Sequence, residues 1–113
     1  MARRKYNNRK VMVDGHKFDS MKEAERYKEL KLLERAGRIK DLELQPKFEL
    51  LPTIRTDKET LRKVSYYADF KYEQDGETVV EDVKGFKTDV YKLKKRIFLL
   101  KYGKEYRFFE NYM

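Results

Sequence analysis

An Asp-Gly pair at residues 75 and 76 is the feature that most constrains how this chain can fold. Two runs rich in β-branched and aromatic residues flank it, at 65–72 and 78–83. This pattern is the strongest short-range indication of a β-hairpin closed by a two-residue turn. Such a turn fixes the register of its two strands. With the pair at its centre, Asp69 lies directly opposite Asp82.

Opposed acids need compensation, because like charges whose β-carbons are about 5 Å apart destabilise a sheet. A divalent cation between Asp69 and Asp82 would offset the repulsion. Lys84 points to the same face, since side chains alternate along a strand. Glu81 falls on the apolar face, so Asp82 is expected to be the working acid. A three-residue loop would shift the register and exchange the roles of these two acids.

Length and composition exclude several classes of protein. At 113 residues the chain is expected to form one domain, residues 1–113. The absence of cysteine excludes disulfides and thiolate metal sites, and a single histidine excludes a multi-histidine zinc site. No segment has the apolar length of a membrane span or a signal peptide. We therefore expect a soluble, cytoplasmic protein without membrane partners.

The net charge of +8 is concentrated in two segments. Residues 1–10, an expected flexible arm, contain five cations and no acid, and residues 87–104 contain seven cations against one acid. Such clustering is typical of proteins that bind nucleic acids, although a solubilising surface is the plain alternative. Candidate contacts to the nucleic acid are Arg3, Arg4, Lys87, Tyr91, Lys94 and Lys95. Taken alone, Lys94 and Lys95 are each better explained as solvated charges, and Tyr91 as either a phosphate contact or a packing residue.

Helical periodicity predicts a first helix over residues 20–36, with Ser20 as its N-cap and Gly37 at its end. Its expected buried stripe is Met21, Ala24, Tyr27, Leu30 and Leu33. A second helix is expected between Thr88 and Gly103. Its expected buried stripe is Val90, Leu93, Ile97 and Leu100.

Strands are expected on either side of the hairpin. The alternation over 41–51 predicts a strand bent near Pro46, and residues 105–109 predict a closing strand. Residues 11–18 indicate a small hairpin around a second Asp-Gly pair, and residues 51–63 are expected to form a loop. The expected order is helix, three strands, helix, strand.

Glu23 is the remaining acid of interest. Ser20-x-x-Glu23 matches a capping box, in which the glutamate bonds back to the N-cap amide. At about 100° per residue, however, Glu23 lies about 20° from Leu30 around the helix and faces inward, whereas Glu25 faces solvent. An inward carboxylate requires a partner, and a metal centre could supply one without excluding the cap.

These residues resemble the signature of the PD-(D/E)xK nuclease superfamily, in which one acid precedes a second acid and a lysine two residues later. Here they are Asp69 and Asp82-Val83-Lys84. The similarity to small phage and prophage endonucleases extends to Phe18-x-Ser20-x-x-Glu23, Gln45-Pro46 and Tyr67-Ala68-Asp69-Phe70. The chain departs from the pattern at Ala68, where proline is usual, and at Asp82, where glutamate is common.

The resemblance implies a fold and a chemistry. The fold would be an α/β restriction-endonuclease-like αβββαβ core, with a mixed central sheet flanked by helices. Asp69 and Asp82 would hold Mg²⁺ or Mn²⁺, with Glu23 and the carbonyl of Val83 as further ligands. Lys84 would orient the attacking water or neutralise charge that develops on the phosphate. A structural ion pair between Lys84 and one acid is the competing interpretation, and it leaves the second acid uncompensated.

The function implied is metal-dependent hydrolysis of DNA phosphodiester bonds. By analogy with phage enzymes of this size, branched DNA such as a Holliday junction is the expected substrate, in phage recombination or replication within a bacterial host cell. Resolving a junction needs two active sites and hence a homodimer. The alternative is a non-catalytic nucleic-acid-binding protein on the same fold, and RNA in place of DNA is left open by the charge.

Overall fold

The hairpin around Asp75-Gly76 forms with the register expected from the sequence. Strand β8 (Phe70–Gln74) pairs antiparallel with β9 (Glu77–Lys84), and Phe70 lies opposite Glu81. Both turn residues have positive φ, 51° at Asp75 and 80° at Gly76, as a tight two-residue hairpin turn requires. The hairpin therefore brings the segments that carry the expected acids side by side.

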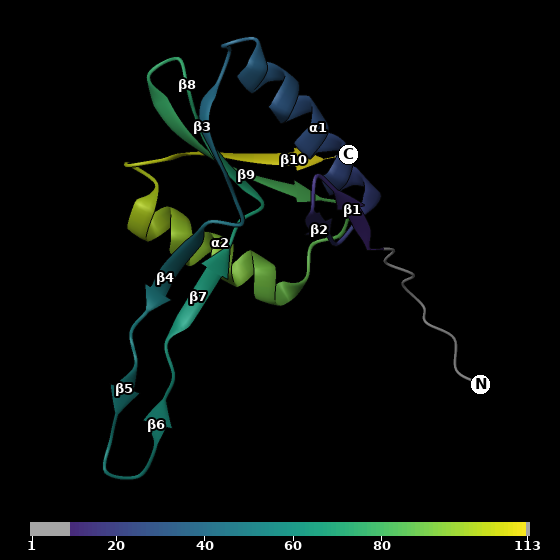
Figure 1. Ribbon diagram of the computed structural model, residues 1–113. Coiled ribbons are helices and arrows are strands. Elements are labelled where there is room, and N and C mark those ends of the chain that lie inside the picture. Colours follow the sequence, from purple (N-terminus) through teal and green to yellow (C-terminus); the bar gives the residue numbers. More distant parts are fainter. Residues whose placement is uncertain (1–9, 113) are drawn as a thin grey trace, which may run out of the picture.

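The computed structural model describes residues 10–112 (Figure 1). In this part of the chain the central sheet has the order β10-β9-β8-β3. Strand β3 (Lys40–Leu44) is antiparallel to β8, and β10 (Arg107–Tyr112) is parallel to β9. A parallel neighbour needs a long crossover, and helix α2 (Asp89–Tyr102) provides it. The fold is thus α/β with a mixed sheet, as expected. The candidate contacts Arg3 and Arg4 lie outside the described residues.

Helix α1 (Met21–Arg35) begins and ends where the sequence predicted. The Ser20 hydroxyl accepts a 3.1 Å hydrogen bond from the Glu23 backbone N–H. The buried residues of α1 are Ala24, Tyr27 and Leu30. They pack on one face of the sheet, against Phe70, Tyr72, Val79 and Val83. Met21, expected in this stripe, is instead 55% exposed. At about 100° per residue it lies about 180° from Leu30 around the helix, so the prediction was wrong at that position.

Helix α2 covers the other face of the sheet, but with a different side than predicted. Its buried residues are Tyr91 and Phe98, whereas Val90 and Leu100 are 64% and 88% exposed. Leu93 is also exposed, and Ile97 is only half-buried. The aromatic and aliphatic stripes lie about 140° apart on the helix. The aromatic side chains offer the larger area for burial, so they face the sheet.

The second core lies under α2. Phe98 and Tyr91 pack there with Val80 of the sheet and with Phe48, Leu50, Tyr66 and Ala68 from outside it. Ala68 is two residues before Phe70, which packs under α1, and in a continuous strand both would lie on the same face. It changes sides because the chain breaks between β7 (Val64–Tyr67) and β8, so the run 65–72 is not one continuous strand.

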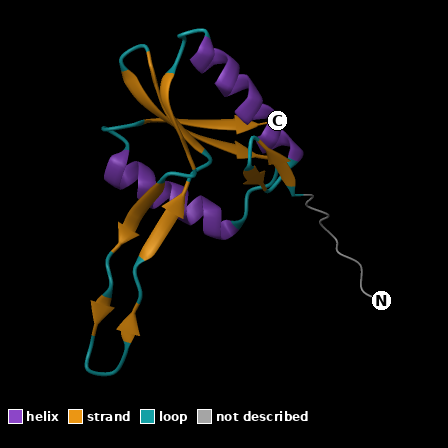
Figure 2. Cartoon of the chain, in the orientation of Figure 1, coloured by secondary structure: helices purple, strands orange, loops and turns teal. Residues whose placement is uncertain are grey.

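A long ribbon projects from the sheet on the side of α2 (Figure 2). Strands β4 (Lys47–Leu51) and β7 pair antiparallel at its base, and β5 (Ile54–Arg55) and β6 (Thr60–Leu61) pair further out. We call residues 47–67 the arm. The expected bend at Pro46 is confirmed as a break between β3 and β4, with Gln45 at φ 50°. The loop expected over 51–63 was wrong, because these residues form the outer ribbon.

The segment before α1 is a small hairpin, as predicted. Strand β1 (Val11–Val13) pairs antiparallel with β2 (His16–Phe18), and Asp14 and Gly15 between them have positive φ. Phe18 is buried in the core under α1. The hairpin therefore packs beside the first turn of α1, where Glu23 lies.

Candidate active site

Asp69 occupies the junction where the chain leaves the arm and enters the central sheet. Its backbone N–H donates to the carbonyl of Glu81 at 3.1 Å, and its carbonyl accepts from the backbone N–H of Gln45 at 2.9 Å. Its carboxylate accepts a 2.7 Å hydrogen bond from the backbone N–H of Val83. The side chain is thus fixed against β9, next to the segment Asp82-Val83-Lys84.

Asp82 is almost fully buried, with 1% of its surface exposed. The Lys84 ammonium lies 3.2 Å from Oδ1, and the Tyr66 hydroxyl donates to Oδ2. Lys84 also lies over the ring of Tyr91, 4.2 Å from its centroid. The structural ion pair that competes with a catalytic role is therefore present for Asp82. In the described residues, no ion pair includes Asp69 or Glu23.

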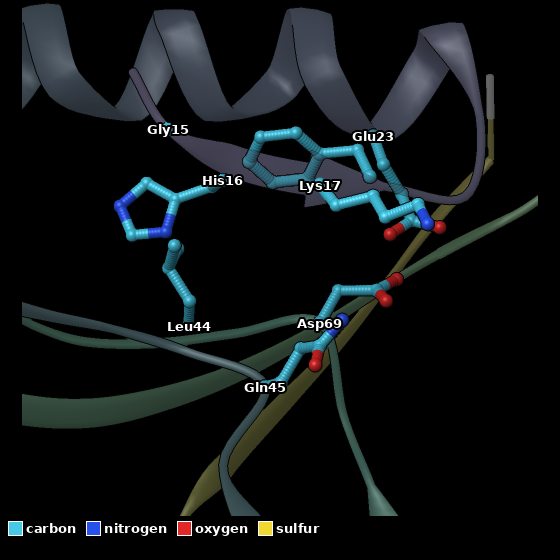
Figure 3. A pocket seen from close by; sticks show the side chains of 8 residues that line it. Gly15, His16, Lys17, Glu23, Leu44, Gln45 and Asp69 are labelled. Carbon is cyan, nitrogen blue, oxygen red and sulfur yellow. The ribbon is translucent and has the colours of Figure 1, made fainter. Parts of the chain in front are cut away.

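Glu23 reaches the same place from the first turn of α1. Figure 3 shows its carboxylate pointing toward that of Asp69. The Ser20 cap uses the backbone of Glu23, which leaves the side chain available to the cavity. Burial and the negative charge of Asp19 raise the pKa of Glu23 above its ordinary value. The inward orientation inferred from the helix angle is confirmed, and Glu25 is exposed as expected.

Negative charge is in excess at this place. Burial, followed by the charges of Asp82 and Glu23, raises the pKa of Asp69 to about 9, although the hydrogen bond from Val83 works in the opposite direction. Lys84 is the cation beside these carboxyl groups. Carboxylate oxygens are the ligands that Mg²⁺ and Mn²⁺ prefer, so the donor set suits such an ion. Within residues 10–112 no group of three acids or histidines already has metal-binding geometry.

A cavity of about 210 Å³ opens beside Glu23 and Asp69. Its far wall is the β1–β2 hairpin, and its floor is the end of β3 (Figure 3). The remaining lining residues are Gly15, His16, Lys17, Phe18, Leu44 and Gln45. Neither His16 nor Gln45 was among the site residues predicted from the sequence. Their place here depends on how the hairpin folds back on α1, which no local pattern reveals.

The comparisons with known proteins find one family. A family model described as "Protein of unknown function (DUF1064)" matches residues 3–109. The chain belongs to the DUF1064 family. No curated protein matches the chain, and no solved structure matches it. The matched range includes Glu23, Asp69, Asp82 and Lys84, so the candidate site lies within the part that defines the family.

In this DUF1064 chain three of the expected nucleic-acid contacts, on α2 and just before it, are grouped around an acid that sequence reasoning missed. Glu110 of β10 lies 3.1 Å from the ammonium groups of both Lys87 and Lys95, and the Tyr91 hydroxyl donates to it. Burial opposes ionisation, but the hydrogen bonds from these three residues lower the pKa of Glu110. Lys94 is half-buried and has no ion pair in the described part. No local sequence pattern marks Glu110 as a partner of these lysines, because only the parallel pairing of β10 with β9 brings it close to them.

Glu81, the acid beside Asp82, has a separate structural environment in this DUF1064 fold. It is fully buried and accepts hydrogen bonds from Arg26 at 2.7 and 3.0 Å, Tyr72 at 2.7 Å and Asn111 at 2.9 Å. Burial disfavours the charge on Arg26, but the hydrogen bonds to Glu81 outweigh this and raise its pKa. Glu81 therefore faces α1, away from Lys84, as the register predicted.

The described part of the chain contains no helix long and apolar enough to cross a bilayer. The longest helix, α1, spans Met21–Arg35 and carries charged residues throughout its length.

Proposed function

We propose that this protein is a metal-dependent endonuclease that hydrolyses phosphodiester bonds in DNA. One observation carries the proposal. The carboxyl groups of Glu23, Asp69 and Asp82 come from α1, the arm junction and β9, and they influence one another beside Lys84. Gathering buried acids in this way opposes folding stability, so it needs a functional reason. The mixed sheet between two helices supports assignment of a restriction-endonuclease-like core.

The four residues would divide the work as follows. Asp69 and Asp82 would bind Mg²⁺ or Mn²⁺ through carboxylate oxygens, and Glu23 and the carbonyl of Val83 would complete the protein ligands. When bound, the cation would activate water and neutralise charge at the scissile phosphate. Asp69 suits this role because no described cation pairs with it, so an added ion would take the place of the proton that this carboxyl group otherwise holds.

Lys84 is placed to hold charge near the substrate. Its ammonium is 3.2 Å from Asp82 and stacked over Tyr91, so its position is defined from two sides. In this place it would orient the attacking water or stabilise negative charge that builds up on phosphate oxygens. A purely structural ion pair with Asp82 would account for Lys84 but not for Glu23 and Asp69.

The proposed substrate is DNA, with branched DNA such as a Holliday junction preferred. The net charge of +8 supports a polyanionic substrate, since neutralising phosphates releases counterions. Cutting a junction symmetrically would require two copies of the site, and we propose a homodimer for this purpose. The setting would be phage recombination or replication in the cytoplasm of a bacterial host.

The deciding experiment compares end-labelled duplex, single-stranded, flap and four-way-junction DNA, and a matched RNA duplex, with Mg²⁺, Mn²⁺ or EDTA. The wild type should cut DNA with either metal and not with EDTA. Asp69→Asn and Lys84→Met should each lower the cleavage rate at least about a hundredfold while binding is retained. A wild type that binds these substrates equally well with EDTA and cuts none of them would instead be a non-catalytic binding protein.

A further inference from the structure

The outer part of the arm is a defined structure that buries almost nothing. Every residue from 52 to 63 is exposed, yet the tip is held by its own hydrogen bonds. The Thr56 backbone N–H donates to the carbonyl of Glu59 at 2.8 Å, and the Thr56 hydroxyl accepts from the N–H groups of Lys58 and Glu59 at 3.2 and 3.0 Å. Thr53 accepts from the N–H of Lys63 at 3.2 Å. The ribbon therefore has a fixed shape and a surface open to a partner.

Packing does not explain why this ribbon exists. Ile54 and Leu61 form a cross-strand pair, but they remain 50% and 46% exposed. A two-stranded ribbon without a face to pack on is marginally stable in water. The arm thus adds little to the stability of the domain, and its use must lie in what it contacts.

The charges of the outer ribbon indicate a polyanionic partner. Residues 52–63 contain two acids, Asp57 and Glu59, and four cations: Arg55, Lys58, Arg62 and Lys63. None of the four cations enters an ion pair with another described residue. By contrast, Lys87, which precedes α2, and Lys95 on α2 are already paired with Glu110. The arm therefore offers four exposed cations on one short ribbon, and none of them is committed to an ion pair in the described part of the chain.

The inner ends of both long strands of the arm, β4 and β7, lie next to the candidate site. Strand β4 follows Gln45-Pro46, and β7 leads into Ala68-Asp69. The Ala68 N–H donates to the Pro46 carbonyl at 3.1 Å, which ties the two ends together at the base. The base of the arm is consequently held beside Asp69, and a partner bound along the arm would lead toward the Asp69 carboxylate.

The reach of the arm matches a dimension of the proposed substrate. Asp57 at the tip lies ten residues beyond Lys47 at the base, so at about 3.3 Å per residue the arm extends up to about 33 Å. One turn of DNA measures about 34 Å along its axis. The major groove, about 12 Å wide, admits a two-stranded β-ribbon.

We propose that the arm lies as a β-ribbon in the major groove of the duplex that flanks the scissile phosphate. Its tip would sit about one helical turn from the cut, and its four cations would contact phosphates on both sides of the groove. The inference rests on the proposed function, since it takes DNA as the substrate. It adds a requirement for about 10 base pairs of duplex on one side of the active site.

The test uses a shortened arm. Leu51 and Val64 are paired at the outer end of the β4–β7 ladder, so replacing residues 52–63 by Asn-Gly closes that ladder with a favoured two-residue turn. Circular dichroism and a melting curve would establish that the variant is folded. A second variant, Arg55→Gln/Lys58→Gln/Arg62→Gln/Lys63→Gln, removes the charge but keeps the ribbon. Its matched control removes four exposed cations from the α1 side: Lys28→Gln, Arg35→Gln, Arg38→Gln and Lys40→Gln.

Binding is measured with EDTA, by fluorescence anisotropy and hydroxyl-radical footprinting on 40-base-pair labelled duplexes and on junctions with arms of 6 to 20 base pairs. The wild type should protect about 10 base pairs beyond the core site, and both arm variants should lose this protection. Their affinity should fall at least about tenfold. The slope of log Kd against log salt concentration should decrease by about 3.6, as expected on losing four phosphate contacts, whereas the control should lose less than half of that.

An unchanged footprint and affinity in the shortened variant would overturn the inference. So would conversion of a dimer into a monomer, seen by light scattering, with the footprint of each protomer unchanged, because the arm would then hold a second copy. A wild type that shows the arm-dependent footprint but cuts nothing would leave the arm inference intact and refute the nuclease. A wild type that binds no DNA would refute both.

Discussion

The backbone N–H of Val83 donates a 2.7 Å hydrogen bond to the Asp69 carboxylate, which joins the two acidic segments through main chain rather than through a cation. This bond fixes the acid without neutralising it. Asp69 consequently stays close to Asp82 and Glu23 without a cation as partner and holds its proton tightly. The pH and metal dependence of the protein should follow from this arrangement.

Asp69→Asn should stabilise the metal-free protein at neutral and higher pH. The pKa of Asp69 is raised from 3.8 to about 9, so the folded state holds this proton more tightly than the unfolded chain. The stabilisation that this proton gives to the folded state is fully present below about pH 3.8 and is lost as the pH rises toward about 9. At pH 8 with EDTA the variant should melt at least about 5 °C above the wild type.

At pH 4 the two proteins should melt at nearly the same temperature, because Asp69 is then protonated in the wild type. The amide of the variant can still accept from Val83, so the substitution tests charge rather than geometry. Circular dichroism melts at both pH values would measure this. Equal destabilisation by Asp69→Asn at pH 4 and pH 8 would contradict the expected excess of negative charge around Asp69.

Divalent metal should stabilise the wild type. At 10 mM Mg²⁺ and a Kd of about 0.1 to 1 mM, binding to the folded state alone adds roughly 1.5 to 3 kcal/mol. Thermal melts should show a rise in Tm that EDTA reverses and that is lost in Asp69→Asn and in Asp82→Asn. A rise of the same size with these variants would place the ion elsewhere.

Lys84→Met should weaken the metal-free protein by about 1 to 3 kcal/mol, since it leaves the buried Asp82 without its cation. Methionine keeps most of the side-chain contact with Tyr91 but lacks the charge. Urea unfolding with EDTA and with Mg²⁺ would measure the effect, and the metal should recover part of the loss. A loss that Mg²⁺ does not change would indicate that the ion does not approach Asp82.

Glu81→Gln should separate stability from chemistry. It breaks the buried ion pair with Arg26 and should cost about 3 kcal/mol in unfolding free energy. Cleavage per folded molecule should remain within about twofold of the wild type, because Glu81 faces α1. Asp82→Asn is the matched comparison and should abolish cleavage while changing stability less. The reverse ranking of the two variants would assign the working acid to Glu81.

The features that sequence reasoning predicted correctly are those encoded by neighbouring residues. The Asp75-Gly76 turn set the register of β8 and β9, and Ser20 and Thr88 set the starts of both helices. Glu23 was placed from its angle relative to Leu30. Each of these depends on a few consecutive residues, so no knowledge of the tertiary structure was needed.

The errors occurred where distant segments compete for the same surface. On α2, the aliphatic stripe that includes Leu93 has regular spacing, but the sheet selects the side of the helix with Tyr91 and Phe98. The outer strands of the arm are only two residues each, too short for alternation to be recognised. Glu110 approaches Lys87 only after β10 pairs with β9.

The arm also changes how this protein will behave in hydrodynamic measurements. The radius of gyration is 16.4 Å, whereas a compact chain of this length would have about 13 Å. A monomer should therefore elute early from a size-exclusion column and give an apparent mass that is too high. Elution volume alone would thus suggest a dimer even for a single chain, and the number of copies should be measured by light scattering or sedimentation equilibrium.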